Sequence, residues 1–197
     1  MNREWVRQAL DDVVNAHNAG ARPRVHGNGF VQLDLTDRRR LHVWGDPRIP
    51  RQVTPSQIHD HTFSFKSQII IGQLVHRTME PRPDPAGAYD LYKAVVRKGE
   101  DTYLGKEPGR FSVTITCEHL AKAGSEYSFQ ASRFHETVAP WLCVTIITKD
   151  GPTLSQGGPP PRVLVPVGLE PDNTFDRYQT PPDALWDIIL QAFKDKP

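Results

Sequence analysis

The segment SQIHDHTFS, residues 56–64, carries two histidines, His59 and His61, with a single residue between them. In an extended strand, residues two apart point to the same face, so both imidazoles would meet on one surface. Neutral imidazole is a ligand for Fe, Zn, Ni, Cu or Mn. A third ligand must come from another strand, and His135 in FHETVA is the best candidate because it also begins a predicted strand. Spacing alone leaves two interpretations open: a metal site, or a polar patch at a strand edge.

Five other histidines need no special role. We expect them to be ordinary surface or half-buried side chains: His17, His26, His42, His76 and His119. Asp60, between the two spaced histidines, would point away from them on a regular strand. We therefore expect it to hold a loop and not to bind the metal.

The composition narrows the class of protein. Among 197 residues, 24 are Lys or Arg and 23 are Asp or Glu, so no global charge field favours nucleic acid. No apolar run approaches the roughly 20 residues of a membrane helix, and the charged amino-terminal segment has no apolar signal core. We expect a soluble cytoplasmic protein without a membrane or nucleic-acid partner. Cys117 and Cys143 lie in apolar, β-branched segments, which is typical of small buried thiols.

Elements that could position the histidines follow from the periodicity. Residues 2–18 and 181–194 have the apolar spacing of helices, and Asn2 can cap the first. Between them, about ten short segments read as strands separated by turns rich in Gly and Pro. They are 30–35, 40–44, 57–65, 67–79, 88–98, 110–120, 126–130, 134–139, 141–149 and 162–168. This pattern predicts an all-β protein, a closed antiparallel β-barrel or jelly roll with a helix at each end.

The histidine pattern resembles the two-part signature of the cupin superfamily: HxH followed by a glycine, here Gly72, and later a single histidine. The resemblance implies one cupin domain over residues 1–197, with the barrel at about 22–168. Many cupins add a carboxylate ligand between HxH and the glycine. No Asp or Glu lies between Asp60 and Glu80, so we expect a site of three histidines: His59, His61 and His135.

Among cupins of this type, the segment SQIHDHTFS is most similar to the first motif of the cysteine and thiol dioxygenases. The dipeptide Trp44–Gly45, about 14 residues upstream, also recurs in that family. The chain departs from the cysteine dioxygenases in two ways. Lys66 stands where they carry a crosslinked cysteine, and no histidine follows His135 to form their Ser-His-Tyr relay. The reaction class is therefore better supported than cysteine as the substrate.

The resemblance implies an Fe(II)-dependent dioxygenase that oxidises a small thiol, such as cysteine, a related aminothiol or a mercapto acid, with O₂. Zn, Ni or Mn remain open as the metal. A carboxylate on the substrate would need a guanidinium partner. The expected substrate-binding residues are Arg24, then Arg51, with Tyr127 and Gln68 as further residues of the pocket. A homodimer is compatible with the superfamily.

Two alternatives remain. The first is a three-histidine cupin with other chemistry, either a dioxygenase acting on a diketone or enol, or an isomerase. The second is a non-catalytic binding module of cupin fold, in which HDH is structural. Metal analysis separates the second from the others, and oxygen uptake with thiols separates the thiol dioxygenase from the first.

Overall fold

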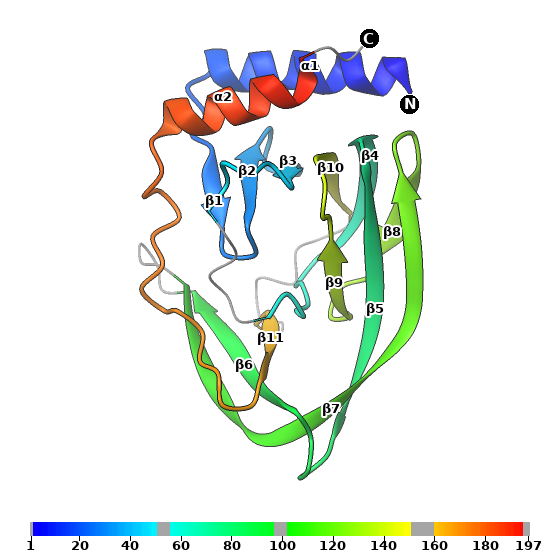
Figure 1. The fold of residues 1–197 in the computed structure, drawn as a ribbon, viewed down its shortest axis with the longest axis vertical. Helices are drawn as coiled ribbons and strands as arrows, with labels where there is room; N and C mark the ends of the chain where they lie inside the picture. Colours follow the sequence, from blue (N-terminus) through cyan, green and yellow to red (C-terminus); the bar gives the residue numbers. More distant parts are fainter. Residues whose placement is uncertain (1, 51–55, 97–101, 151–159, 195–197) are drawn as a thin grey trace.

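The computed structural model describes residues 2–50, 56–96, 102–150 and 160–194. Antiparallel strands form two curled sheets that face one another, and two helices lie side by side across one end (Figure 1). The all-β class and the two terminal helices are confirmed. The finer assignment to a cupin jelly roll, as a single domain, stays a prediction. None of the helices in the described ranges is long and apolar enough to cross a membrane.

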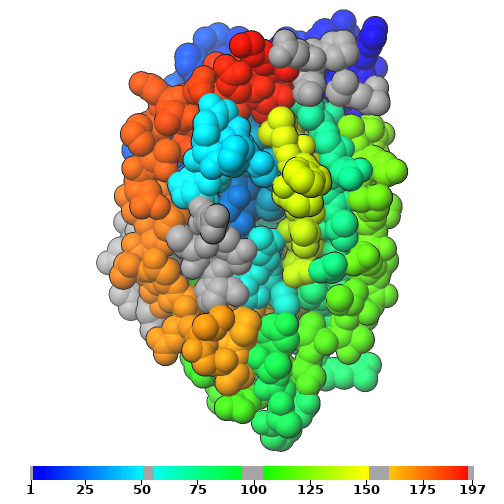
Figure 2. Space-filling view, viewed as in Figure 1, coloured from blue at the N-terminus to red at the C-terminus, as the bar shows by residue number. Residues whose placement is uncertain are grey.

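The first sheet has six strands, and every neighbouring pair in it is antiparallel. In spatial order they are β1 (Arg24–His26), β2 (Phe30–Asp34), β3 (Arg39–Trp44), β10 (Cys143–Asp150), β4 (Ser64–Ile71) and β8 (Glu126–Phe129). The space-filling view shows β10 in yellow beside the cyan β3 segment, beneath the carboxy-terminal helix (Figure 2).

The second sheet has five strands, also paired antiparallel. Their order is β11 (Arg162–Pro166), β6 (Tyr89–Val96), β7 (Thr102–Lys122), β5 (Gln73–Pro83) and β9 (Phe134–Val138). The long β7 carries an exposed Cys117. Of the two expected buried thiols, only Cys143 is buried, because it lies on the inner face of the first sheet.

The helices, α1 (Arg3–Asn18) and α2 (Pro182–Phe193), cover the outer face of the six-stranded sheet. The Asn2 side chain caps α1 as predicted, accepting hydrogen bonds from the backbone N–H groups of Glu4 and Trp5. Side chains that alternate along the strands pack against the helices and form the main core. The sheet contributes Val31, Leu33, Leu41, Val43, Ile70, Val144 and Ile146 to it.

The alternate positions of the same strands face the interior, where the side chains are aromatic and polar. They include Phe30, Gln32, Arg40, His42, Trp44, Phe65, Ser67 and Thr145. Because side chains in a strand alternate between faces, an apolar outer face covered by helices leaves the inner face free to carry a site. The sheet therefore separates the part of the protein that stabilises the fold from the part that could bind a ligand.

Two of the expected strands near the histidines differ in the structure. The segment predicted as one strand at 67–79 is divided at Gly72, which has a φ of +75° and turns the chain from the first sheet into the second. The segment predicted as a strand at 57–65 is regular only from Ser64 onward, with isolated bridges at His59. The two spaced histidines therefore do not lie on a regular strand.

We predict that Gly72→Ala lowers the free energy of unfolding by about 3 kcal/mol. A Cβ at this position would overlap the backbone carbonyl of Leu142, and the positive φ disfavours any L side chain. Chemical denaturation measures the loss. The control is Gly109→Ala, which has a φ of +95° but no heavy atom within 4 Å of the added Cβ. It should cost only about 1 kcal/mol. Equal losses in the two variants would contradict the overlap with Leu142.

Candidate metal centre

The HDH segment is fixed by backbone hydrogen bonds to two edge strands, β9 and β11. The N–H of His59 donates to the carbonyl of His135 at 3.0 Å, and the N–H of His135 donates back at 2.8 Å. The N–H of Asp60 donates to the carbonyl of Arg162 at 3.0 Å. This pairing places His135 directly opposite His59, although 76 positions separate them in sequence.

Asp60 holds the segment through its side chain and takes no part in the histidine cluster. Its carboxylate is 3% exposed and pairs with the guanidinium of Arg162, whose Nε donates to Oδ2 at 2.7 Å. The backbone N–H of Arg162 also donates to Oδ1. Burial raises the pKa of Asp60, and the bonds from Arg162 lower it, with burial the larger effect. The expected role of Asp60, holding a loop, agrees with these contacts.

The imidazoles of His59, His61 and His135 converge into one group, here called the three-histidine cluster. Each can offer a ring nitrogen such that all three nitrogens lie within 4.8 Å of one another. The ring centroid of His59 is 4.7 Å from that of His61 and 4.5 Å from that of His135. Small side-chain rotations bring such nitrogens within the metal–nitrogen distance of about 2.1 Å. The structure thus brings the three predicted ligands together, and their role as ligands stays a prediction.

The protonation of the cluster suits a metal. The Nδ1 of His59 is 2.6 Å from the carbonyl oxygen of Gln57, so it donates there and leaves the Nε2 lone pair available. His135 is 4% exposed, and neither of its ring nitrogens has a hydrogen-bond partner. Burial lowers the pKa of all three histidines, which keeps them neutral. Buried nitrogens without a partner are costly, and a metal ion would satisfy them.

The donor set contains only imidazole within the part of the chain that the structure describes. The segment between HDH and Gly72 adds no carboxylate to the cluster within the described residues: Phe65 packs against the cluster, whereas Lys66 is exposed on the opposite face of β4. A neutral nitrogen set of this kind fits Fe(II), Zn, Ni or Mn, and does not by itself select among them.

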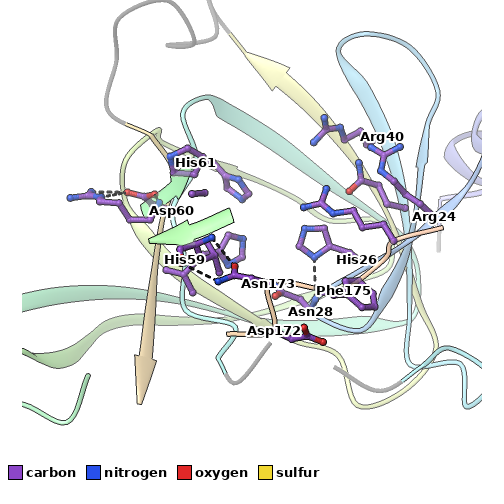
Figure 3. A pocket seen from close by; sticks show the side chains of 18 residues that line it. Arg24, His26, Asn28, Arg40, His59, Asp60, His61, Asp172, Asn173 and Phe175 are labelled. Atoms are coloured by element: carbon purple, nitrogen blue, oxygen red, sulfur yellow. Dashed lines mark hydrogen bonds and ion pairs between the residues drawn. The ribbon is translucent and has the colours of Figure 1, made fainter. Parts of the chain in front are cut away.

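Two cavities meet at the cluster. The outer cavity has a volume of about 270 Å³, and several charged side chains are among the residues that line it. Figure 3 shows His59 and His61 on one side of it, Arg24 and Arg40 on the other, and His26 between them. The inner chamber, about 60 Å³, lies against all three histidines and is mostly aromatic. Its walls include Phe30, Trp44, Phe63, Phe65 and Tyr127.

The segment between β11 and α2 forms one wall of the outer cavity through Asp172, Asn173, Phe175 and Arg177. The side chain of Asn173 accepts from the backbone N–H of Leu104 at 2.8 Å and donates to its carbonyl at 3.3 Å. The side-chain amide of Asn173 therefore pairs with Leu104 as the backbone of a neighbouring strand would. These two hydrogen bonds connect this wall of the cavity to the second sheet.

Of the four expected substrate-binding residues, Arg24 and Tyr127 line a cavity in the described structure, and Gln68 does not. Arg24 lines the outer cavity and pairs with Asp34 at 2.8 Å. Tyr127 is half-buried beside the inner chamber, and burial raises its pKa to about 12. Gln68 lies on β4 among the residues facing away from the interior, and it lines neither cavity. Arg51 lies outside the described residues.

Three histidines that the sequence analysis treated as ordinary lie near the cluster. His26 and His42 line the inner chamber, and the ring of His76 is 5.0 Å from that of His135. Both ring nitrogens of His42 and of His76 are buried without a hydrogen-bond partner. Burial lowers the pKa of His42 to about 3 and that of His76 to about 4. The signal for His42 was its place in RLHVW, where it alternates with Leu41 and Val43 and so faces the interior.

We predict that His42→Leu makes the metal-free protein less sensitive to acid. A histidine whose pKa falls from 6.5 in the unfolded chain to about 3 in the folded protein binds protons preferentially when unfolded. Its contribution to stability is therefore lost as pH falls below 6.5, by about 2 kcal/mol at pH 5. Urea unfolding between pH 7 and pH 5 measures the slope. The exposed His119→Leu serves as the control. A wild-type slope in His42→Leu would contradict the buried neutral state.

The sequence matches no model of a known protein family, and no curated protein matches it. The solved structures that are partly similar include two hydroquinone dioxygenases. Hydroquinone 1,2-dioxygenase from Sphingomonas sp. TTNP3 with 4-hydroxybenzoate bound is 13% identical, with a TM-score of 0.32 over 60% of this chain and 63% of that chain. A hydroquinone 1,2-dioxygenase in complex with Cd²⁺ and 4-hydroxybenzonitrile is 15% identical, with a TM-score of 0.30 over 61% and 63%. Each match spans less than two thirds of the neighbour's chain, and scores of this size carry no argument about activity.

Proposed function

We propose that His59, His61 and His135 hold one ferrous ion and that the protein is a dioxygenase for a small thiol. The observation that carries the proposal is the convergence of three neutral imidazoles between two cavities, with no carboxylate joining them among the residues that the structure describes. A ferrous ion there would supply a Lewis acid for a substrate anion and the electrons that O₂ activation needs.

The neutral donor set bears on the kind of substrate. Three imidazoles leave the full charge of a divalent ion uncompensated, which favours an anionic, chelating substrate such as a thiolate. Asp60, the carboxylate closest in sequence, is neutralised by Arg162 and does not reduce that charge. The proposal therefore takes an aminothiol or a mercapto acid as its substrate class.

Arginines of the outer cavity would orient a substrate that carries a second anionic group. Arg24 and Arg40 both pair with Asp34, at 2.8 and 2.9 Å, and both line the cavity opposite the cluster. Five N–H groups on each guanidinium leave donors for a substrate carboxylate after one carboxylate partner is satisfied. Arg24 remains the first choice for this role.

The inner chamber would keep bulk water from the reacting atoms. Phe63 stacks on the ring of His61 with centroids 5.0 Å apart, and Phe65 meets the same ring edge-on at 5.4 Å. Aromatic walls on one side of the cluster leave the outer cavity, with its charged side chains, as the route of entry for the substrate.

The resemblance of the segment SQIHDHTFS to the thiol dioxygenases supports a thiol as the substrate. The positions that differ from those enzymes argue against cysteine as the specific thiol. Lys66 faces solvent, so the crosslinked cysteine of the mammalian-type enzymes has no counterpart on that strand. Tyr127 still lines the inner chamber, but it comes from β8, before the third histidine. Strict cysteine oxidation is therefore not proposed.

Oxygen uptake by iron-loaded protein tests the proposal with cysteine, cysteamine, 3-mercaptopropionate and a peptide with an amino-terminal cysteine. Adding both atoms of O₂ to a thiol gives the sulfinic acid without an external reductant, so mass spectrometry should find a gain of two oxygens. His135→Ala should abolish uptake and His119→Ala should retain it. If iron binds and none of the four thiols is oxidised, the thiol assignment is wrong, and enols or diketones become the substrates to assay.

A further inference from the structure

His26 occupies a distinct position beside the three-histidine cluster. It is the last residue of β1, and its half-buried ring lines both the outer cavity and the inner chamber. In the close view it lies between the histidines of the cluster and the arginines of the opposite wall (Figure 3). The group of converging nitrogens in the described chain does not include it. His26 is therefore next to the centre without being one of its ligands.

The hydrogen bonding of His26 determines which ring nitrogen carries the proton. The backbone N–H of Asn28 donates to Nδ1 at 3.2 Å, so Nδ1 is an acceptor. Burial, and after it the charge of Arg177, lowers the pKa of His26 well below its usual value and keeps the ring neutral. In a neutral imidazole with Nδ1 as acceptor, Nε2 bears the hydrogen. The donor is thus at the far end of the side chain, away from its own backbone.

The orientation of the ring is also restrained. His26 stacks on Phe30 with centroids 4.4 Å apart and planes at 10°, and Phe30 in turn contacts Trp44 at 4.0 Å. A ring held on one face by an aromatic and at Nδ1 by the backbone has little freedom to turn. The Nε2–H group, its remaining polar atom, belongs to a ring that lines both cavities.

We propose that Nε2–H of His26 donates a hydrogen bond to the anionic ligand atom bound at an open position of the three-histidine centre. The inference rests on the proposed metal site but not on the identity of the substrate. It makes His26 a residue that orients the bound anion and selects ligands able to accept a hydrogen bond. The donor would come from β1, upstream of HDH, and no residue after His135 is needed for it.

The test uses azide as the anion and cobalt-substituted protein, in which visible absorption reports ligand binding without turnover. His26→Phe keeps an aromatic ring against Phe30 but removes the donor, and His26→Gln restores an N–H. We expect Co(II) affinity within about twofold of wild type in both variants. The azide Kd should rise about tenfold in His26→Phe, the effect of losing one hydrogen bond, and recover in part in His26→Gln. His119→Phe is the matched control at an exposed histidine.

An unchanged azide Kd in His26→Phe would overturn the inference, and so would loss of Co(II), which would make His26 a ligand or a structural residue. A wild-type protein that takes up no Co(II) would overturn it as well. The proposed function can fail while this inference holds. If azide binding depends on His26 but the protein oxidises none of the four thiols, His26 still donates to the bound anion and the thiol assignment is wrong.

Discussion

His135→Ala should bind Fe(II) at least about a hundredfold more weakly than wild type. Removing even an outer partner of a metal ligand costs 10- to 100-fold in affinity, and His135 is one of the three imidazoles that converge among the described residues. Its ring is buried against those of His59 and His61, so water does not readily replace its nitrogen. Competition with a metal chelator under anaerobic conditions gives the affinity of both proteins.

The same variant needs a check on folding, because removing a buried ring also leaves a cavity. The backbone of β9 remains paired with β5, from Phe134 to Val138, and does not need the His135 side chain. We therefore expect the metal-free variant to stay folded, as circular dichroism can show. His119→Ala, at an exposed position of β7 that is not part of the three-histidine cluster, should bind metal as wild type does. Wild-type affinity in His135→Ala would remove His135 from the site.

Arg162→Met should lower the free energy of unfolding by about 3 kcal/mol. Asp60 is 3% exposed and would lose its ion-pair partner, and Phe134 would lose the guanidinium that lies over its ring at 4.8 Å. This loss in the free energy of unfolding is at the low end of the range for breaking a buried ion pair. The reason is that the Arg162 side chain is 30% exposed and its backbone N–H still donates to Asp60. Since Asp60 separates His59 from His61, metal affinity should fall about tenfold as well.

The pH dependence identifies the cause. The pKa of Asp60 is already raised by burial, and loss of Arg162 raises it further. A carboxyl whose pKa is raised in the folded protein favours folding when it is protonated. The deficit of Arg162→Met relative to wild type should therefore shrink as pH falls through that pKa. Arg48→Met is the control, since Arg48 pairs with Asp46 and Asp187 but is 44% exposed. It should cost at most about 1 kcal/mol. A pH-independent deficit in Arg162→Met would contradict an unpaired charge.

The sequence was sufficient for the class of fold, the terminal helices and the three histidines that converge. These features depend on local patterns: helical periodicity, the cap at Asn2, and the HxH spacing. The three histidines do not converge in the way that the sequence predicted, because His59 and His61 do not lie on a regular strand. His59 meets His135 through a bridge between irregular backbone and β9, and Asp60 is held by Arg162, which lies 102 positions away. Pairings over such distances leave no local trace in a single sequence.

The remaining differences concern which side of a strand faces the site. Both faces of the first sheet are covered, one by helices and one by the second sheet, so apolar alternation alone does not identify the interior. Gln68 is one position from Ser67, and that step moves it to the face away from the chamber. His26 and His42 occupy inward positions, but their surroundings become visible only when β1, β2, β3 and β10 are placed side by side.

The central claim is that three histidines bind one metal ion, and the metal content of purified wild-type protein tests it most directly. After anaerobic loading with Fe(II) and removal of excess metal, we expect one iron per chain, with three imidazole nitrogens in its coordination shell by X-ray absorption. A protein that retains no iron, or iron bound without imidazole, would contradict the account.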